Sequence, residues 1–138
     1  MIIFEVPGKP VAKGRPRLSK YGHTYTPDKT AKYENLVKLS FVSKYMNFEP
    51  LKGYIEANIT AIFDVPKSYS KKKTKELLEN HNNYDHKPDL DNIAKIILDS
   101  LNGIAYKDDS QITILHINKE YGEKAKVIVE LKEVNNES

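Results

Sequence analysis

One stretch of the chain alternates strictly between apolar and polar side chains, and this alternation limits the folds that are open to the sequence. Side chains along a β-strand point to opposite faces of its sheet in turn, so the pattern predicts a strand from about Tyr54 to Phe63 with one buried face. The alternating apolar residues are Ile55, Ala57, Ile59, Ala61 and Phe63, and the polar residues between them are Glu56, Asn58 and Thr60. We therefore expect a sheet that is covered on one side.

Three other segments have the periodicity or the end signals of helices. Apolar residues at helical spacing predict a helix from about Asp28 to Lys44. Ser70 can cap a short lysine-rich helix that ends near Asn80. A third helix should run from Leu90 to Leu101 and stop at Asn102–Gly103, because glycine accepts the left-handed conformation that commonly follows a helix.

The remaining β-rich segments complete the predicted fold. Ile2 to Val6 should form the first strand, and Ile112 to Tyr121 and Ala125 to Glu133, joined around Gly122, are expected to form an antiparallel hairpin. These elements predict an α+β fold, in which a mixed or antiparallel sheet of about four strands packs against two to three helices.

Length and composition restrict the class of protein. The 138 residues predict a single domain over 1–138, with a basic arm at about 8–23 and a frayed tail at about 135–138. No cysteine is present, so a metal site must use oxygen or histidine ligands. No stretch approaches the roughly 20 apolar residues of a membrane span, and the N-terminus lacks the features of a signal peptide, so we expect a cytoplasmic protein without a membrane partner.

Positive charge is concentrated in two places although the net charge is only +3. The stretch GKPVAKGRPRL interleaves glycine and proline with basic residues, which predicts an exposed arm rather than a helix. Such clusters attract phosphate backbones, although a solvated surface is the ordinary alternative. The candidate DNA-binding residues are Lys9, Lys13, Arg15 and Arg17 in the arm and Lys71, Lys72 and Lys73 in the lysine-rich helix.

The third predicted helix opens with an unusual acidic pattern, KPDLDNIAK. Asp89 is a reasonable N-cap, and Asp91 lies in the first turn, where the helix dipole favours negative charge. Asp91 and Lys95 are four residues apart and could form an ordinary surface ion pair. The same carboxylates are also the oxygen ligands that Mg²⁺ or Mn²⁺ requires.

A second acidic pair, Asp108 and Asp109, follows the helix in the stretch YKDDSQI. A turn needs one aspartate and gains little from two adjacent like charges. If this turn returns beside the start of the helix, a third carboxylate joins Asp89 and Asp91, and the group would need a cation. Spacing leaves both the metal site and an ordinary polar surface open.

Together these motifs resemble the signature of the RusA family of Holliday junction resolvases, which are metal-dependent endonucleases. The likeness includes KPDLDNIAKIILDSLNG, YKDDSQI, GKPVAKGRPRL, TYTPDKTAKYE and VPKSYSKKKTKE in the same order, from Val6 to about Ile117. The resemblance implies that Asp89, Asp91 and Asp109 are the essential acidic residues and that Lys95 is the functional lysine. Asp108 is adjacent to Asp109, and spacing cannot separate the two as the third metal ligand.

The resemblance also implies a reaction and its partners. A homodimer of small α+β subunits would bind four-way junction DNA and cut it by paired symmetric hydrolysis of phosphodiesters. Mg²⁺, with Mn²⁺ as a substitute, would be the cofactor, and no organic cofactor is expected. Two alternatives stay open: a metal-dependent nuclease that acts on other branched DNA or RNA, and a non-catalytic module that binds branched DNA.

Overall fold

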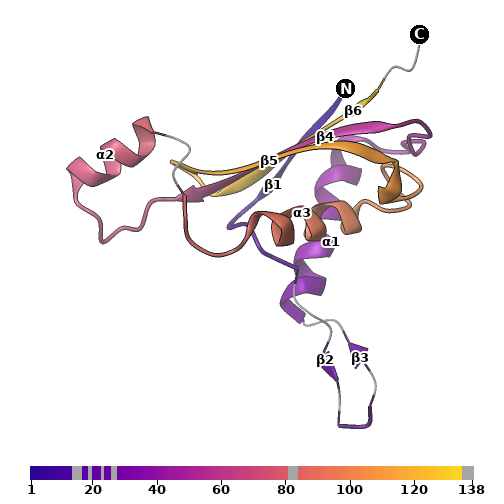
Figure 1. The fold of residues 1–138 in the computed structure, drawn as a ribbon, viewed down its shortest axis with the longest axis horizontal. Helices are drawn as coiled ribbons and strands as arrows, with labels where there is room; N and C mark the ends of the chain where they lie inside the picture. The colour runs from indigo at the N-terminus through magenta and orange to yellow at the C-terminus, as the bar shows by residue number, and fades with distance from the viewer. Residues whose placement is uncertain (14–16, 19, 23, 26–27, 81–83, 135–138) are drawn as a thin grey trace.

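The structure is a computed structural model, which describes residues 1–13, 17–18, 20–22, 24–25, 28–80 and 84–134. Its main sheet has four strands in the order β1, β6, β4, β5, and it packs against helices (Figure 1). The strands are β1 (Ile2–Pro7), β4 (Ile55–Asp64), β5 (Ile112–Gly122) and β6 (Lys126–Glu133), and the helices are α1 (Asp28–Lys44), α2 (Lys71–Glu79) and α3 (Leu90–Ser100). The predicted α+β fold with a mixed sheet is therefore confirmed.

Strand β4 forms over nearly the stretch that its alternation predicted, and it lies inside the sheet, between β6 and β5. It pairs with β6 in antiparallel orientation on one side and with β5 in parallel orientation on the other. Every second residue from Ile55 to Phe63 is buried, while the residues between them are only partly covered. The apolar side of the strand therefore faces the protein core, and the polar side lies on the other face of the sheet.

The predicted hairpin of the last two strands is wrong. Both strands form, but β4 lies between β5 and β6, so the two do not pair with each other. Residues 123–125 cross the end of β4, a span of two strand spacings or roughly 10 Å, which three residues can bridge. Gly122 is needed beside this crossing, because a Cβ there would lie 2.4 Å from Cγ2 of Ile62.

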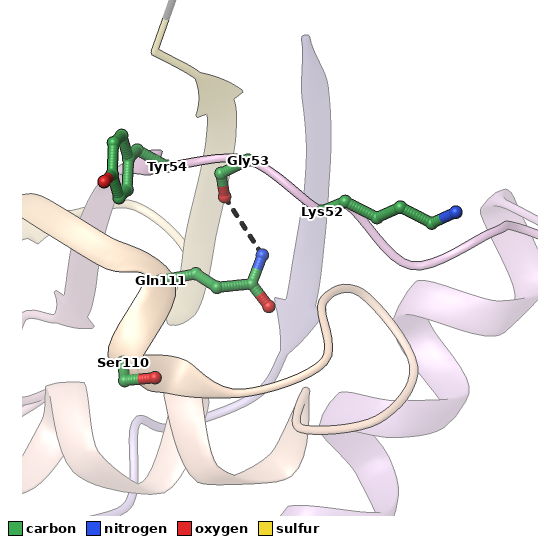
Figure 2. A pocket seen from close by; sticks show the side chains of 5 residues that line it. All are labelled: Lys52, Gly53, Tyr54, Ser110 and Gln111. Atoms are coloured by element: carbon green, nitrogen blue, oxygen red, sulfur yellow. Dashed lines mark hydrogen bonds between the residues drawn. The ribbon is translucent and has the colours of Figure 1, made fainter.

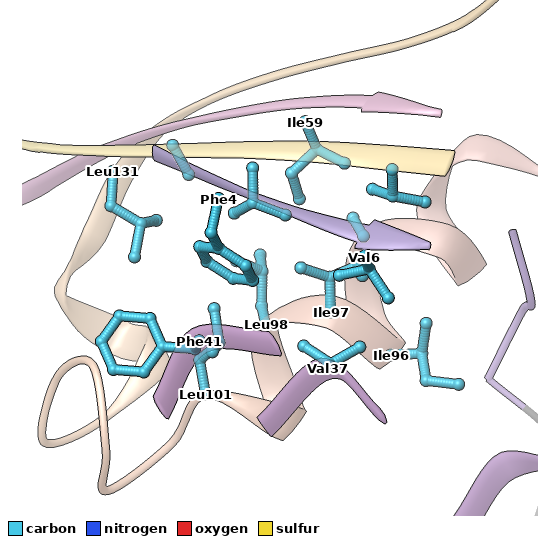
Figure 3. Close-up of a cluster of buried hydrophobic side chains, with 14 of the residues drawn as sticks. Phe4, Val6, Val37, Phe41, Ile59, Ile96, Ile97, Leu98, Leu101 and Leu131 are labelled. Atoms are coloured by element: carbon cyan, nitrogen blue, oxygen red, sulfur yellow. The ribbon is translucent and has the colours of Figure 1, made fainter. Parts of the chain in front are cut away.

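Helices α1 and α3 cover one face of the sheet and complete the core (Figure 3). From α1, Tyr33, Val37 and Phe41 are buried at four-residue spacing, as expected for a helix that packs along one stripe. The ring of Phe41 packs edge-on against Phe4 of β1, with centroids 5.5 Å apart. Truncating such a fully buried aromatic ring to alanine typically costs about 3–5 kcal/mol, so Phe41 is a major anchor of α1 on the sheet.

Two smaller parts project from this body (Figure 1). Strands β2 (Arg17–Leu18) and β3 (Thr24–Tyr25) form a separate two-stranded ladder within and just beyond the predicted basic arm. Helix α2 has no buried residue, and the predicted cap forms, because the Ser70 hydroxyl accepts a hydrogen bond from the Lys73 backbone N–H at 3.1 Å. No helix in the described part of the chain is long and apolar enough to cross a membrane.

Candidate active site

The start of α3 carries two exposed carboxylates. Asp89 occupies the N-cap position as predicted, but its side chain makes no capping hydrogen bond. Its two carboxylate oxygens instead accept hydrogen bonds from Nζ of Lys87, at 3.1 and 3.2 Å. Asp91 lies in the first helical turn, where the structure gives it no ion pair or hydrogen bond with any described side chain. Neither carboxylate therefore has an essential role in capping the helix.

The remainder of α3 separates a core side from a polar side. Ile93, Ile96 and Ile97 are buried, whereas Lys95 is exposed. Leu90, the first residue of the helix, is 40% exposed. The ordinary ion pair between Asp91 and Lys95, which the spacing left open, does not form among the described residues.

Asp108 acts as a structural cap for the short 3-10 helix η1 (Asp109–Gln111). Its carboxylate accepts a hydrogen bond from the backbone N–H of Ser110 at 3.1 Å. Hydrogen bonds from the Ser110 side chain and backbone hold the pKa of this carboxyl below its usual value. Asp108 is thus stabilised in its ionised form by the turn that it caps.

Asp109 is in the opposite situation although it is the next residue. Partial burial raises its pKa, and the charges of Asp108 and Asp99, with a hydrogen bond to the Asp99 side chain, raise it further. The charge of Lys95 acts in the other direction. The like charges of Asp99 and Asp109 oppose each other when both carboxyl groups are ionised.

This contact adds a carboxyl group to the arrangement that the sequence suggested. The charges of Asp99 and Lys95 act on Asp109, so the acidic turn lies near the middle and end of α3. Asp99 was not among the site residues predicted from the sequence.

The turn is held in place by Gln111, which sequence reasoning also missed. Its amide joins the acidic turn to residues 51–53, which precede the central strand β4 (Figure 2). Asp108 and Gln111 together form a capping box. The three-residue spacing between an aspartate and a glutamine is the signal that could have identified it.

Lys13, one of the predicted DNA contacts, is tied to the protein itself. Its Nζ lies 2.8 Å from Oε2 of Glu34 and 3.5 Å from Oδ2 of Asp99, and its backbone N–H donates to the Asn92 carbonyl. Desolvation lowers the pKa of Lys13, but the hydrogen bond and charge of Glu34, helped by Asp99, give a net increase. In the free protein this lysine therefore fixes the base of the arm against α3.

The other predicted DNA contacts differ in how far the structure describes them. Lys9 is exposed after β1, and Lys71, Lys72 and Lys73 are exposed in the first turn of α2. Arg15 lies outside the described residues, and for Arg17 only the backbone in β2 is described. Among the predicted contacts whose side chains are described, Lys9 and the three lysines of α2 form no ion pair with a described residue.

The donor atoms around the turn suit a divalent cation. Among the described residues, no three acidic or histidine side chains already stand in an arrangement that could hold a metal ion. Hard cations such as Mg²⁺ nevertheless prefer carboxylate oxygens, and Asp99 and Asp109 bring two carboxyl groups into contact. A cation would relieve the repulsion between them.

Comparison with known proteins gives two matches. A family model described as endodeoxyribonuclease RusA matches residues 7–132. The chain is also similar to a protein from Bacillus subtilis (strain 168) that is named uncharacterized protein YqaN, with 36% identity over 139 residues and coverage of 97% of each chain. Since the family model spans most of the sequence, the chain belongs to the RusA endodeoxyribonuclease family.

Proposed function

We propose that the protein is a divalent-metal-dependent endonuclease that resolves four-way DNA junctions by paired hydrolysis of phosphodiesters. The observation that carries this proposal is the environment of Asp109. Its carboxyl group is partly buried, contacts Asp99 and interacts with the positive charge of Lys95. Two like charges in contact oppose folding, although Asp99 also pairs with Lys13, whereas a cation and a phosphate would use both the acids and Lys95. The family match independently supports cleavage of DNA.

Asp89, Asp91 and Asp109 are the proposed ligands of the cation. Asp91 has no competing partner in the described structure, and Asp89 has only the exposed Lys87 ammonium. Asp108 is the weaker candidate, because its carboxylate already caps η1. Asp99 of α3 contacts Asp109 and is proposed to help orient its carboxyl group rather than to bind the cation. When bound there, Mg²⁺ would supply Lewis-acid activation of the phosphate and lower the pKa of the attacking water.

Lys95 is proposed to act on the substrate phosphate. Its exposed ammonium lies on the polar side of α3, within electrostatic reach of Asp109. There it would neutralise the negative charge that develops on the phosphate oxygens as water attacks the phosphorus. The bond between phosphorus and the 3′-oxygen then breaks, which leaves a 5′-phosphate and a 3′-hydroxyl.

The choice of a junction substrate rests on the resemblance of the motifs to RusA resolvases. Two subunits related by a two-fold axis would present two such sites to opposing strands, which is what symmetric nicking requires. The exposed lysines of α2 and the cations of the arm are proposed to hold the phosphate backbone. A nuclease for other branched DNA or RNA would use the same cations and acidic site on a different arrangement of strands. A non-catalytic binding module would use the cations and would not need the acidic site.

The decisive experiment is nicking of a labelled synthetic four-way junction with Mg²⁺ or with EDTA. Wild-type protein should give paired nicks only with the metal, and Asp91→Asn and Asp109→Asn should bind the junction without cutting it. Matched duplex, flap and RNA substrates test the specificity. Faster cutting of any of these would replace the resolvase assignment with a different nuclease, and tight binding without cleavage under any metal would indicate a non-catalytic binding module.

A further inference from the structure

The side-chain amide of Gln111 uses all of its main hydrogen-bonding capacity. Its Oε1 accepts from the backbone N–H groups of Lys107 and Asp108 at 2.9 and 3.0 Å. Its Nε2 donates to the backbone carbonyl oxygens of Leu51 and Gly53 at 2.8 and 3.0 Å. The two N–H groups require an acceptor and the two carbonyls require a donor, so the orientation of this amide is chemically fixed.

These bonds join two segments that are distant in the sequence. Leu51 and Gly53 precede the central strand β4, and Leu51 is itself fixed because its backbone N–H donates to the Ala105 carbonyl at 2.8 Å. The other two partners, Lys107 and Asp108, directly precede Asp109. Gln111 therefore connects the acidic turn to the segment that leads into the central strand of the sheet.

The regular ladder between β4 and β5 does not make this connection. The pairing of the two strands shifts between Ile55 and Glu56, next to the residues where β5 begins. A hollow of about 490 Å³, which Lys52, Gly53, Tyr54, Ser110 and Gln111 line, opens beside the turn (Figure 2). Beside this hollow, the Gln111 side chain bridges the turn and residues 51–53.

We infer that Gln111 is a positioning residue for the proposed metal site and that its four hydrogen bonds hold Asp109 where a divalent cation can use it. This inference rests on the proposed function. Glutamine suits the role because it bonds both segments without adding a negative charge beside Asp108 and Asp109. A glutamate would keep the acceptor for Lys107 and Asp108 but would repel the carbonyls of Leu51 and Gly53.

The test compares Gln111→Met, which removes all four bonds at similar volume, with Gln111→Glu, which keeps only the acceptor side. Thr113→Ala, an exposed change two residues along, is the matched control. The measurements are the Mg²⁺ concentration that gives half-maximal nicking, Mn²⁺ binding without DNA by electron paramagnetic resonance, junction affinity in EDTA, and amide hydrogen exchange at Lys107 and Asp108.

Half-maximal nicking by both Gln111 variants should require at least about 10-fold more Mg²⁺ than nicking by wild type, as is typical when a residue that orients a metal ligand is lost. Mn²⁺ binding should weaken in parallel. High Mg²⁺ should restore most of the rate, which it cannot do for Asp109→Asn. The junction affinity of the Gln111 variants should equal that of wild type, and Thr113→Ala should match wild type in every measurement. Exchange at Lys107 and Asp108 should accelerate in Gln111→Met and remain slower in Gln111→Glu.

Two outcomes separate the inference from the proposed function. If wild-type protein cuts the junction and the variants keep its Mg²⁺ requirement and Mn²⁺ affinity, Gln111 does not position the site, whatever happens to thermal stability or exchange. If wild-type protein neither binds Mn²⁺ nor cuts DNA, the proposed function fails and the inference fails with it. Should Gln111→Met not fold, Gln111→Glu alone decides between these outcomes.

Discussion

The start of α3 and the turn before β5 each present two aspartates near a helix N-terminus, but the structure uses them differently. In the turn, Asp108 caps η1 with its side chain, whereas at α3 the corresponding N-cap residue, Asp89, makes no such bond. The second aspartate of each pair also differs. Asp91 is exposed, and Asp109 is partly buried beside another carboxyl group.

The comparison teaches that the same local pattern can hide different uses of a carboxylate. Asp108 contributes to the fold, and its pKa is lowered by the bonds it accepts. Asp109 has a raised pKa because burial and neighbouring acids disfavour its charge. A charge that the fold opposes is the better candidate for chemistry, since carboxyl groups with shifted pKa values concentrate at functional sites.

The largest expected effect separates the carboxylates that the fold uses from those that it does not. Asp91→Asn and Asp109→Asn should each slow junction nicking by at least about 100-fold, because each removes a ligand of the proposed cation. Asp108→Asn should slow it by less than about 10-fold, because asparagine is also a good N-cap. Single-turnover nicking rates at saturating protein would measure this, and an equal loss in Asp108→Asn would remove the distinction.

Lys95→Ala should have the next largest effect. Loss of the ammonium near the proposed phosphate should reduce the nicking rate by about 10- to 100-fold while junction binding stays within a few-fold of wild type. Rate and affinity are measured on the same labelled junction. Lys107→Ala, an exposed lysine beside the acidic turn, is the control, and an equal slowing in that variant would mean that general positive charge matters rather than Lys95.

A change on α2 should affect binding and leave the acidic regions intact. Replacing Lys71, Lys72 and Lys73 with alanine should weaken junction binding and reduce the slope of log affinity against log salt by about 1 to 3, since each lost phosphate contact contributes about 0.9. Lys13→Met should leave this slope closer to wild type, because its ammonium is paired with Glu34. Equal slopes for wild type and the α2 variant would exclude α2 from the DNA interface.

The smallest expected effects are changes in Tm, which should have opposite signs when Asp109 and Asp108 are replaced. The folded-state pKa of Asp109 is raised, so its contribution to stability is present below the unfolded pKa and is lost as pH rises through the folded pKa. At neutral pH without metal, Asp109→Asn should therefore raise Tm slightly, and this gain should shrink in acid.

Asp108 should behave in the reverse way. Its folded-state pKa is lowered, so its contribution is present above the unfolded pKa and is lost as pH falls through the folded pKa. Asp108→Ala should lower Tm at neutral pH. Melting curves followed by circular dichroism across acid and neutral pH would measure both, and shifts of the same sign at neutral pH would contradict the different roles of the two residues.

Local signals in the sequence were sufficient to predict the three α-helices and the four strands of the main sheet, although not the short strands β2 and β3. The bounds of α1 agree with the prediction, and Gly103 adopts the left-handed conformation expected just beyond α3, with φ of 82°. Periodicity, caps and turn residues act over a few neighbouring residues, so they can be recognised without knowing the remainder of the chain. The same is true of the aspartate and lysine motifs that resemble the RusA family.

Tertiary structure alone decided which elements and side chains meet. The pairing of β4 between β5 and β6 replaces the predicted hairpin, because apolar alternation specifies a buried face but does not specify a neighbour. Likewise, Asp108 and Asp109 are equivalent by spacing, and only their surroundings distinguish a cap from a carboxyl group held beside Asp99. The sequence by itself thus determined the local elements and the chemical types of the site residues, whereas contacts between distant segments determined their environments.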